Sequence, residues 1–122
     1  MSETELMRVL KFLRDRADTI RDLEAQAKQE LETRGDKDVY DRLLQQKAQL
    51  ISYLPEELPQ EAHSLPPGQK NLVLSELDSM RSRAQQALQL QSPFFMALLL
   101  YPQDYREGED NELESLLRQL EG

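Results

Sequence analysis

The chain has 122 residues, a formal net charge of −8 and no cysteine. Its length suits a single domain with a real hydrophobic core, which we expect to span residues 1–122. The lack of cysteine excludes a disulfide framework, thiol catalysis and a thiolate metal site. The acidic balance would repel a phosphate backbone, so it argues against a nucleic-acid partner.

The choice of apolar residues predicts an all-α fold. The sequence contains 23 Leu residues but only 8 Val, Ile and Thr residues together. Because β-branched residues are the usual components of strands, this imbalance favours helices. No period-two alternation of apolar and polar residues indicates a sheet. We therefore expect a small bundle of four to five helices.

The longest regular pattern lies in residues 3–33 and predicts one long helix. Its apolar seam advances in alternating steps of four and three, as in a coiled coil. Arg14, Arg21 and Lys28 form a basic line on one flank, which we interpret as a solvated face. Gly35 is the expected stop, and Asp36 or Asp38 can cap the next helix. The seam consists of Leu6, Leu10, Leu13, Ala17, Ile20, Glu24, Ala27 and Leu31.

A second helix is predicted from about residue 38 to residue 54, forming an antiparallel hairpin over residues 3–54. In the register that the short connection implies, facing residues have numbers that sum to about 71. Glu24, the polar position of the first seam, then lies opposite Lys47, the charged position of the second. We interpret this pair as a device that fixes the register and not as a catalytic dyad. The inward positions of the second helix are Tyr40, Leu43, Leu44, Lys47, Leu50, Ile51 and Leu54.

Residues 5–54 resemble the helical hairpin of flagellar and type III export chaperones. The features that carry the resemblance are the long first helix, the break at Gly35-Asp36, and a Leu-rich second helix that contains Lys47 (VYDRLLQQKAQLI, residues 39–51). The resemblance implies a helical hairpin fold and an export-chaperone-like role. It does not include the proline-rich loop or the segment from Phe94 to Tyr101.

Residues 55–68 hold four of the six prolines, so they predict a loop with one short helical turn near residues 56–62. A third helix should follow over residues 69–91. A last helix is predicted over residues 111–121, because Asn111 and Glu114 form a capping box ahead of leucines on one face. The seam of the third helix is Val73, Leu77, Met80, Ala84, Ala87 and Gln91.

The segment from Ser92 to Pro102 is the most apolar part of the chain. Ser92 is a good N-cap, Pro93 fits the first helical position, and Pro102 ends the segment, so we expect a helix over residues 93–101. Such a helix is apolar on every side and must be buried or covered by a partner. We expect it to pack against residues 6–13 of the first helix and to leave part of its apolar surface exposed.

The sequence offers little catalytic chemistry. His63 is the only histidine, it lies in the proline-rich loop, and no Glu-x-x-His spacing suggests a metal centre. The four glycines are scattered singly, so no phosphate-binding loop is present. The acidic stretch from Asp104 to Glu112 lacks the ligand spacing of an EF-hand. We therefore predict no enzyme activity, no cofactor, and no catalytic, metal or cofactor-binding residues.

The pattern as a whole favours a non-enzymatic interaction protein, such as an adaptor, chaperone or subunit. Its partner would be another protein or a second copy of the chain. An alternative is a binder of a small molecule or lipid tail, in a pocket between helices. The side chains that would line this pocket are Phe12, Phe94, Phe95, Met96 and Tyr101. The apolar segment is too short to insert across a membrane, and the N-terminus lacks the pattern of a signal peptide, so we expect a cytoplasmic protein. The predicted partner-binding residues are Phe12, Phe94, Phe95, Leu98 and Tyr101.

Overall fold

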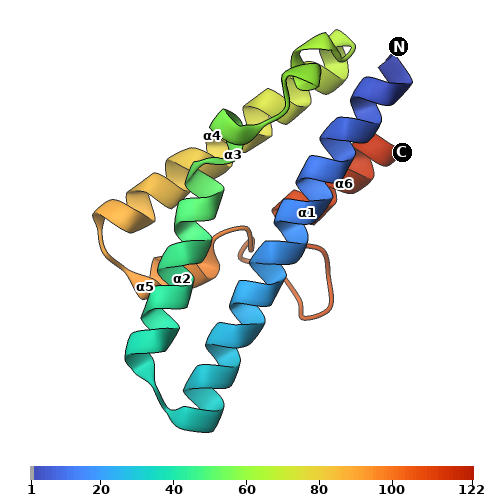
Figure 1. The fold of residues 1–122 in the computed structure, drawn as a ribbon. Helices are drawn as coiled ribbons and strands as arrows, with labels where there is room; N and C mark the ends of the chain where they lie inside the picture. The colour runs from blue at the N-terminus through green and yellow to red at the C-terminus, as the bar shows by residue number, and fades with distance from the viewer. Residues whose placement is uncertain (1) are drawn as a thin grey trace.

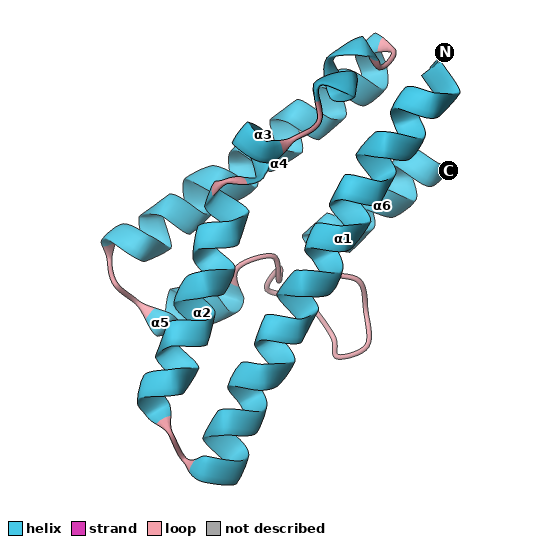
Figure 2. Ribbon diagram, in the orientation of Figure 1, coloured by secondary structure: helices cyan, strands magenta, loops and turns pink. Residues whose placement is uncertain are grey.

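The computed structural model describes residues 2–122, so Met1 lies outside it. The fold is all-α over that range, as predicted, and it is a small helical bundle (Figures 1 and 2). None of the helices in residues 2–122 has the length and apolar character needed to cross a membrane. In chain order the elements are α1 (Ser2–Gln29), a π-helical turn η1 (Glu30–Arg34), α2 (Lys37–Ser52), α3 (Leu54–Glu57), a 3₁₀ turn η2 (Gln60–Ser64), α4 (Pro67–Gln89), α5 (Pro93–Leu98) and α6 (Glu112–Glu121).

α1 and α2 form the predicted antiparallel hairpin (Figure 1). The first helix ends in η1 because Gly35 adopts a left-handed conformation with φ 64°, which a residue without a Cβ takes at little cost. The backbone N–H of Gly35 donates to the carbonyl oxygen of Leu31 at 3.1 Å. The side chain of Asp36 then accepts from the N–H of Val39 at 3.1 Å and caps α2. Both signals were visible in the sequence.

The core follows most of the predicted seam positions, but Leu31, the last seam position of the first helix, is exposed. In α2 the inner positions from Leu44 to Ile51 are buried or half-buried, Leu54 is buried at the start of α3, and Tyr40 and Leu43 lie at the edge of the core. Gln91 is a second exception, because the third long helix ends at Gln89 and Gln91 is exposed with φ 49°. The chain turns back there, and the N–H of Ser92 donates to the carbonyl oxygen of Ala87 at 3.2 Å.

The predicted packing of the Phe94–Tyr101 segment against residues 6–13 is wrong. α5 packs on α2 and α4, while the N-terminal part of α1 contacts η2 and α6 (Figure 1). The proline-rich segment supplies buried Ala62 and Leu65, so this end of α1 is already covered. The three-residue connection from Leu90 to Ser92 also keeps α5 beside the C-terminal end of α4.

α5 is shorter than the predicted helix over residues 93–101, because it ends at Leu98. Leu100 is buried and has φ 76°, a conformation that is rare for a residue with a bulky side chain. Its carbonyl oxygen accepts from the N–H of Glu112 at 2.9 Å, which ties the segment to the start of α6. Tyr101 is thereby turned toward the hairpin and away from the surface of α5.

α6 runs along α1 and begins with the predicted capping box, in which Asn111 and Glu114 exchange side-chain and backbone hydrogen bonds. Two members of the basic line face it and form ion pairs, Arg21 with Glu114 at 2.7 Å and Arg14 with Glu121 at 3.5 Å. The interpretation of this line as a solvated face is therefore wrong for Arg21. The acidic C-terminal helix supplies partners that lie 93 and 107 residues away in the sequence. The leucines that α6 buries are Leu113, Leu116, Leu117 and Leu120.

Candidate functional site

The candidate site lies in the part of the chain that carries no charge. From Ala84 to Gln103 the sequence has no charged side chain, although 31% of all residues are charged. The fold places this stretch in the second half of α4, in α5 and in the turn that follows. It includes four large hydrophobic side chains that face water, which we call the apolar patch: Leu90 (57% exposed), Phe94 (68%), Phe95 (49%) and Leu98 (48%).

The geometry of α5 explains this exposure. The side chain of Ser92 accepts from the N–H of Phe95 at 3.2 Å, and Pro93 occupies the first helical position, as predicted. A helix this short can bury only one side, and it buries Met96. Phe94 and Phe95 remain outside and contact each other edge to face, with ring centroids 5.5 Å apart. Their contact makes the two rings one continuous apolar surface.

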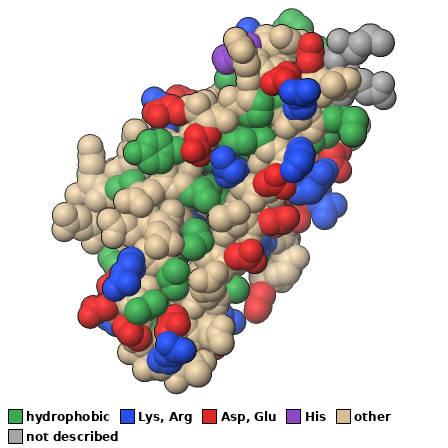
Figure 3. Space-filling view, in the orientation of Figure 1, with side chains coloured by type: hydrophobic (Ala, Val, Ile, Leu, Met, Phe, Trp, Pro, Cys, Tyr) green, Lys and Arg blue, Asp and Glu red, His purple; other side chains and the backbone are tan. Residues whose placement is uncertain are grey.

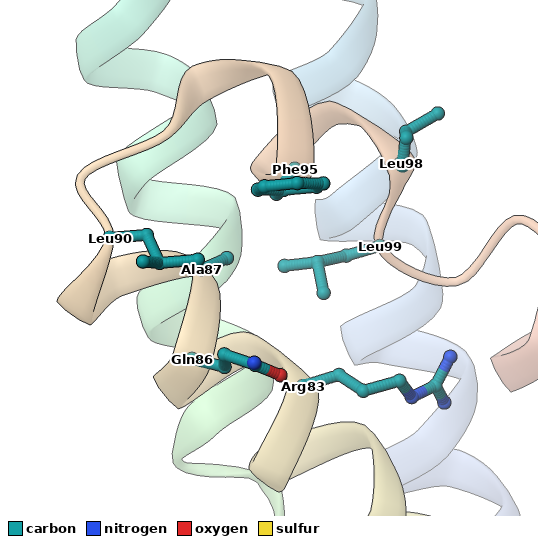
Figure 4. A pocket seen from close by; sticks show the side chains of 7 residues that line it. All are labelled: Arg83, Gln86, Ala87, Leu90, Phe95, Leu98 and Leu99. Carbon is teal, nitrogen blue, oxygen red and sulfur yellow. The ribbon is translucent and has the colours of Figure 1, made fainter.

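A hollow of about 240 Å³ opens between α4 and α5 beside these rings. In the close-up of Figure 4, Phe95 lies at one end of the hollow and Arg83 at the other. The guanidinium of Arg83 is paired with Glu112 at 2.7 Å, so its charge is already compensated. Most of the lining is apolar, as in sites that accept a hydrophobic group. The lining residues are Arg83, Gln86, Ala87, Leu90, Phe95, Leu98 and Leu99.

The structure brings together three of the five predicted partner-binding residues: Phe94, Phe95 and Leu98. Phe12 lies on α1, half-buried, with the guanidinium of Arg16 4.7 Å from its ring centroid. Tyr101 is also half-buried and points into a polar network. The five side chains therefore do not line one pocket.

Sequence reasoning missed Leu90, which is as exposed as the two phenylalanines. A signal for it was present in the sequence, because Leu90 falls outside the seam of α4 and stands among glutamines in Gln-Leu-Gln. An apolar residue off the buried stripe of a helix, just before a chain turn, has no core position to occupy.

The inner side of the segment meets the predicted pair of Glu24 and Lys47, whose charged atoms are 2.8 Å apart. Lys47 is completely buried, and its ammonium also donates to the carbonyl oxygen of Ala97 at 3.0 Å. The hydroxyl of Tyr101 donates to Glu24 Oε1 at 2.6 Å. Together these bonds join α1, α2 and the end of α5, so the pair positions the segment as well as the hairpin.

The network continues to α6 through Arg21, which donates to the hydroxyl of Tyr101 at 3.1 Å and pairs with Glu114. Burial lowers the pKa of Lys47 below its ordinary value, and the nearby carboxylate of Glu24 opposes this shift only in part. Burial and the hydrogen bond to Glu24 raise the pKa of Tyr101 above its ordinary value. We call Lys47, Glu24, Tyr101, Arg21 and Glu114 the polar network.

A second hollow, of about 350 Å³, lies beside the polar network, with Glu24, Lys47 and Tyr101 among its lining residues. The polar groups of these three residues are already engaged in the bonds described above, which fix the segment. His63 is exposed in η2. Among the described residues, no group of three or more His, Asp or Glu side chains is arranged to hold a metal ion.

No model of a known protein family matches the chain, and no curated protein or solved structure matches it either.

Proposed function

We propose that this protein is a non-enzymatic interaction module that binds another protein surface through the apolar patch. The observation that carries the proposal is the continuity of four large hydrophobic side chains, each about half exposed or more. Three of them line one hollow, and the fourth, Phe94, contacts Phe95. Their exposed parts add up to on the order of 400 Å² of apolar surface, the size of patch that often marks a binding site on a monomer.

The patch exposes more apolar surface than a packed core requires. The inner residues Met96, Leu99 and Leu100 are buried, whereas Phe94 is 68% exposed. A polar side chain at position 94 would keep α5 soluble at little cost in buried area. Four large apolar residues at solvent positions therefore have a better explanation in binding than in folding.

The surroundings of the patch resemble the anatomy of a protein–protein interface. Its centre is aromatic and aliphatic, and the exposed amides of Gln86, Gln89 and Gln91 lie on the nearby turns. Interfaces are enriched in aromatic residues, depleted in charges at the centre, and polar at the rim. The surface of a partner protein, with an apolar side chain for the hollow and polar groups for the rim, fits this arrangement.

Site-specific photocrosslinking tests the proposal in the cells that make the protein. A photoreactive phenylalanine analogue at position 98 should crosslink to one defined protein species. The same analogue at Gln26, an exposed position on α1, serves as the matched control and should not. Equal crosslinking from both positions, or none from position 98, would contradict the proposal. Recovery of a bound small molecule in place of a protein would favour the pocket-binding alternative.

A further inference from the structure

A protruding side chain lies beside a hollow at the surface of the molecule. Phe94 is the most exposed residue of the apolar patch and stands beside Phe95, which forms one wall of the hollow. An apolar cavity of about 150 Å³ can hold a benzene molecule. The hollow, at about 240 Å³, therefore has room for the phenyl ring of a phenylalanine.

This arrangement is self-complementary. If two copies meet face to face, a two-fold axis in the interface plane, midway between the ring and the hollow, places each Phe94 over the hollow of the other copy. Contacts of this kind, in which the same surface serves both partners, define the isologous interface of a two-fold dimer. One chain thus carries both halves of the contact.

The charge distribution makes the apolar patch the place where two copies can approach each other. Each copy has a net charge of −8, so two copies repel each other over most of their surfaces. The stretch from Ala84 to Gln103 carries no charge, and Arg83 at its edge is paired with Glu112 within the same chain. Two copies can therefore approach at the apolar patch without opposing like charges. A partner selected by its own charge would find no complementary group there.

The area of the apolar patch indicates how tightly two copies can associate. The patch offers on the order of 400 Å² per copy, about half of the roughly 800 Å² that each partner buries in a standard interface. The neighbouring glutamines can add polar contacts at the rim. A dimer of this size belongs among weak or transient complexes, with a dissociation constant on the order of 10–100 µM.

We infer that the protein forms a two-fold symmetric homodimer in which Phe94 of each copy inserts into the hollow between α4 and α5 of the other. The inference rests on the proposed function and narrows it, because it names a second copy of the chain as the partner.

Sedimentation equilibrium of the full chain, from about 1 µM to about 1 mM, tests the inference directly. The wild type should show a monomer–dimer equilibrium, and Phe94→Ala should weaken it at least about tenfold. Tyr53→Ala is the matched control, since Tyr53 is a comparably exposed aromatic residue outside the patch, and it should leave the equilibrium unchanged. A wild type that stays monomeric at about 1 mM would overturn the inference, as would undiminished dimerisation of Phe94→Ala.

Mixing two variants tests the geometry. Leu90→Asp places a carboxylate in the wall of the hollow, so neither hollow of its homodimer can bury a ring without desolvating a charge. Phe94→Ala keeps the hollow but lacks the ring. An equimolar mixture should associate more strongly than either variant alone, because one intact ring can enter one intact hollow. A mixture no stronger than the separate variants would overturn the proposed arrangement. Circular dichroism of both variants verifies that they are folded.

The two proposals can fail separately. If the wild type is monomeric but position 98 crosslinks to a different protein, the homodimer is excluded and the interaction module remains. If position 98 crosslinks only to a second copy of the chain, both are supported. If neither experiment detects association, both are wrong.

Discussion

On its inner side, the segment from Pro93 to Tyr101 meets a completely buried lysine, and on its outer side it leaves two phenylalanines and a leucine in water. A charged group is thus buried on one side of this short segment, while large apolar groups are exposed on the other. The space-filling view in Figure 3 shows charged side chains along much of one face of the molecule. The ion pair of Lys47 with Glu24 differs from these, because its lysine is completely buried. The comparison indicates that directional polar bonds fix the position of the segment, whereas its outer apolar residues are free to serve binding.

The strongest way to break this arrangement is to remove the buried ammonium. In Lys47→Leu, the carboxylate of Glu24 would lose its counter-charge and the carbonyl of Ala97 its donor. We expect the free energy of unfolding to fall by about 2–4 kcal/mol, measured by chemical denaturation. Lys11→Leu is the control, because Lys11 forms only an exposed pair with Asp15 and should change stability little. Equal stability of the two variants would show that the polar network is not important for folding.

A smaller loss is expected from the hydroxyl at the centre of the network. Tyr101→Phe removes the donor to Glu24 and the acceptor for Arg21 but keeps the ring. The expected loss is about 1–2 kcal/mol in a thermal or chemical melt. Tyr53→Phe offers a control, since Tyr53 is an exposed tyrosine outside the polar network. A larger effect at position 53 than at 101 would contradict the importance assigned to the network.

The outer end of the network should respond to acid. Burial acts to raise the pKa of Glu114, but the hydrogen bonds from Arg21 and from the N–H of Asn111 outweigh it and lower the pKa below its ordinary value. A lowered pKa in the folded state gives stability that is present above the pKa of the unfolded chain and is lost as the pH falls through the folded-state value. Glu114→Gln should therefore cost about 1 kcal/mol at neutral pH and progressively less in acid.

Denaturation of this variant and the wild type between neutral pH and about pH 2.5 measures the effect. Glu107→Gln, in the exposed acidic loop, is the control and should track the wild type throughout. A constant difference between Glu114→Gln and the wild type at every pH would show that the charge of Glu114 contributes nothing.

The smallest effect is expected on the outer side of the segment. Phe94→Ala should change the free energy of unfolding by less than about 0.5 kcal/mol when the protein is dilute enough to be monomeric, because the ring is mostly in water. A loss above about 1 kcal/mol would mean that the apolar patch supports the fold, and the contrast between the two sides would disappear.

The sequence was sufficient for the hairpin and its ion pair, because the two polar seam positions coincide only in the correct register. It was not sufficient for the position of α5, which depends on the chain reversal at Gln91 and on long-range bonds to Arg21 and Lys47. The positive φ of Leu100, which directs Tyr101 inward, has no sequence signal of the kind that glycine provides.

For the candidate site, the excess of apolar residues correctly indicated exposed hydrophobic side chains at positions 94, 95 and 98. The separate location of Phe12 was readable in principle, since Arg16 follows it by four residues and such pairs meet on one helix face. The hollow beside Phe95 was not readable, because its shape depends on how α4 and α5 pack.

The pairing of α6 with α1 has a consequence for the order of events during synthesis. The hairpin of α1 and α2 is complete by residue 54, and its contacts are local, so it can form while the chain is still being made. The ion pair between Arg21 and Glu114 spans 93 residues and closes only after α6 has left the ribosome. At about 5–20 residues per second, the side of α1 that faces α6 stays uncovered for several seconds. During that interval a nascent-chain chaperone could bind α1 where α6 will later dock.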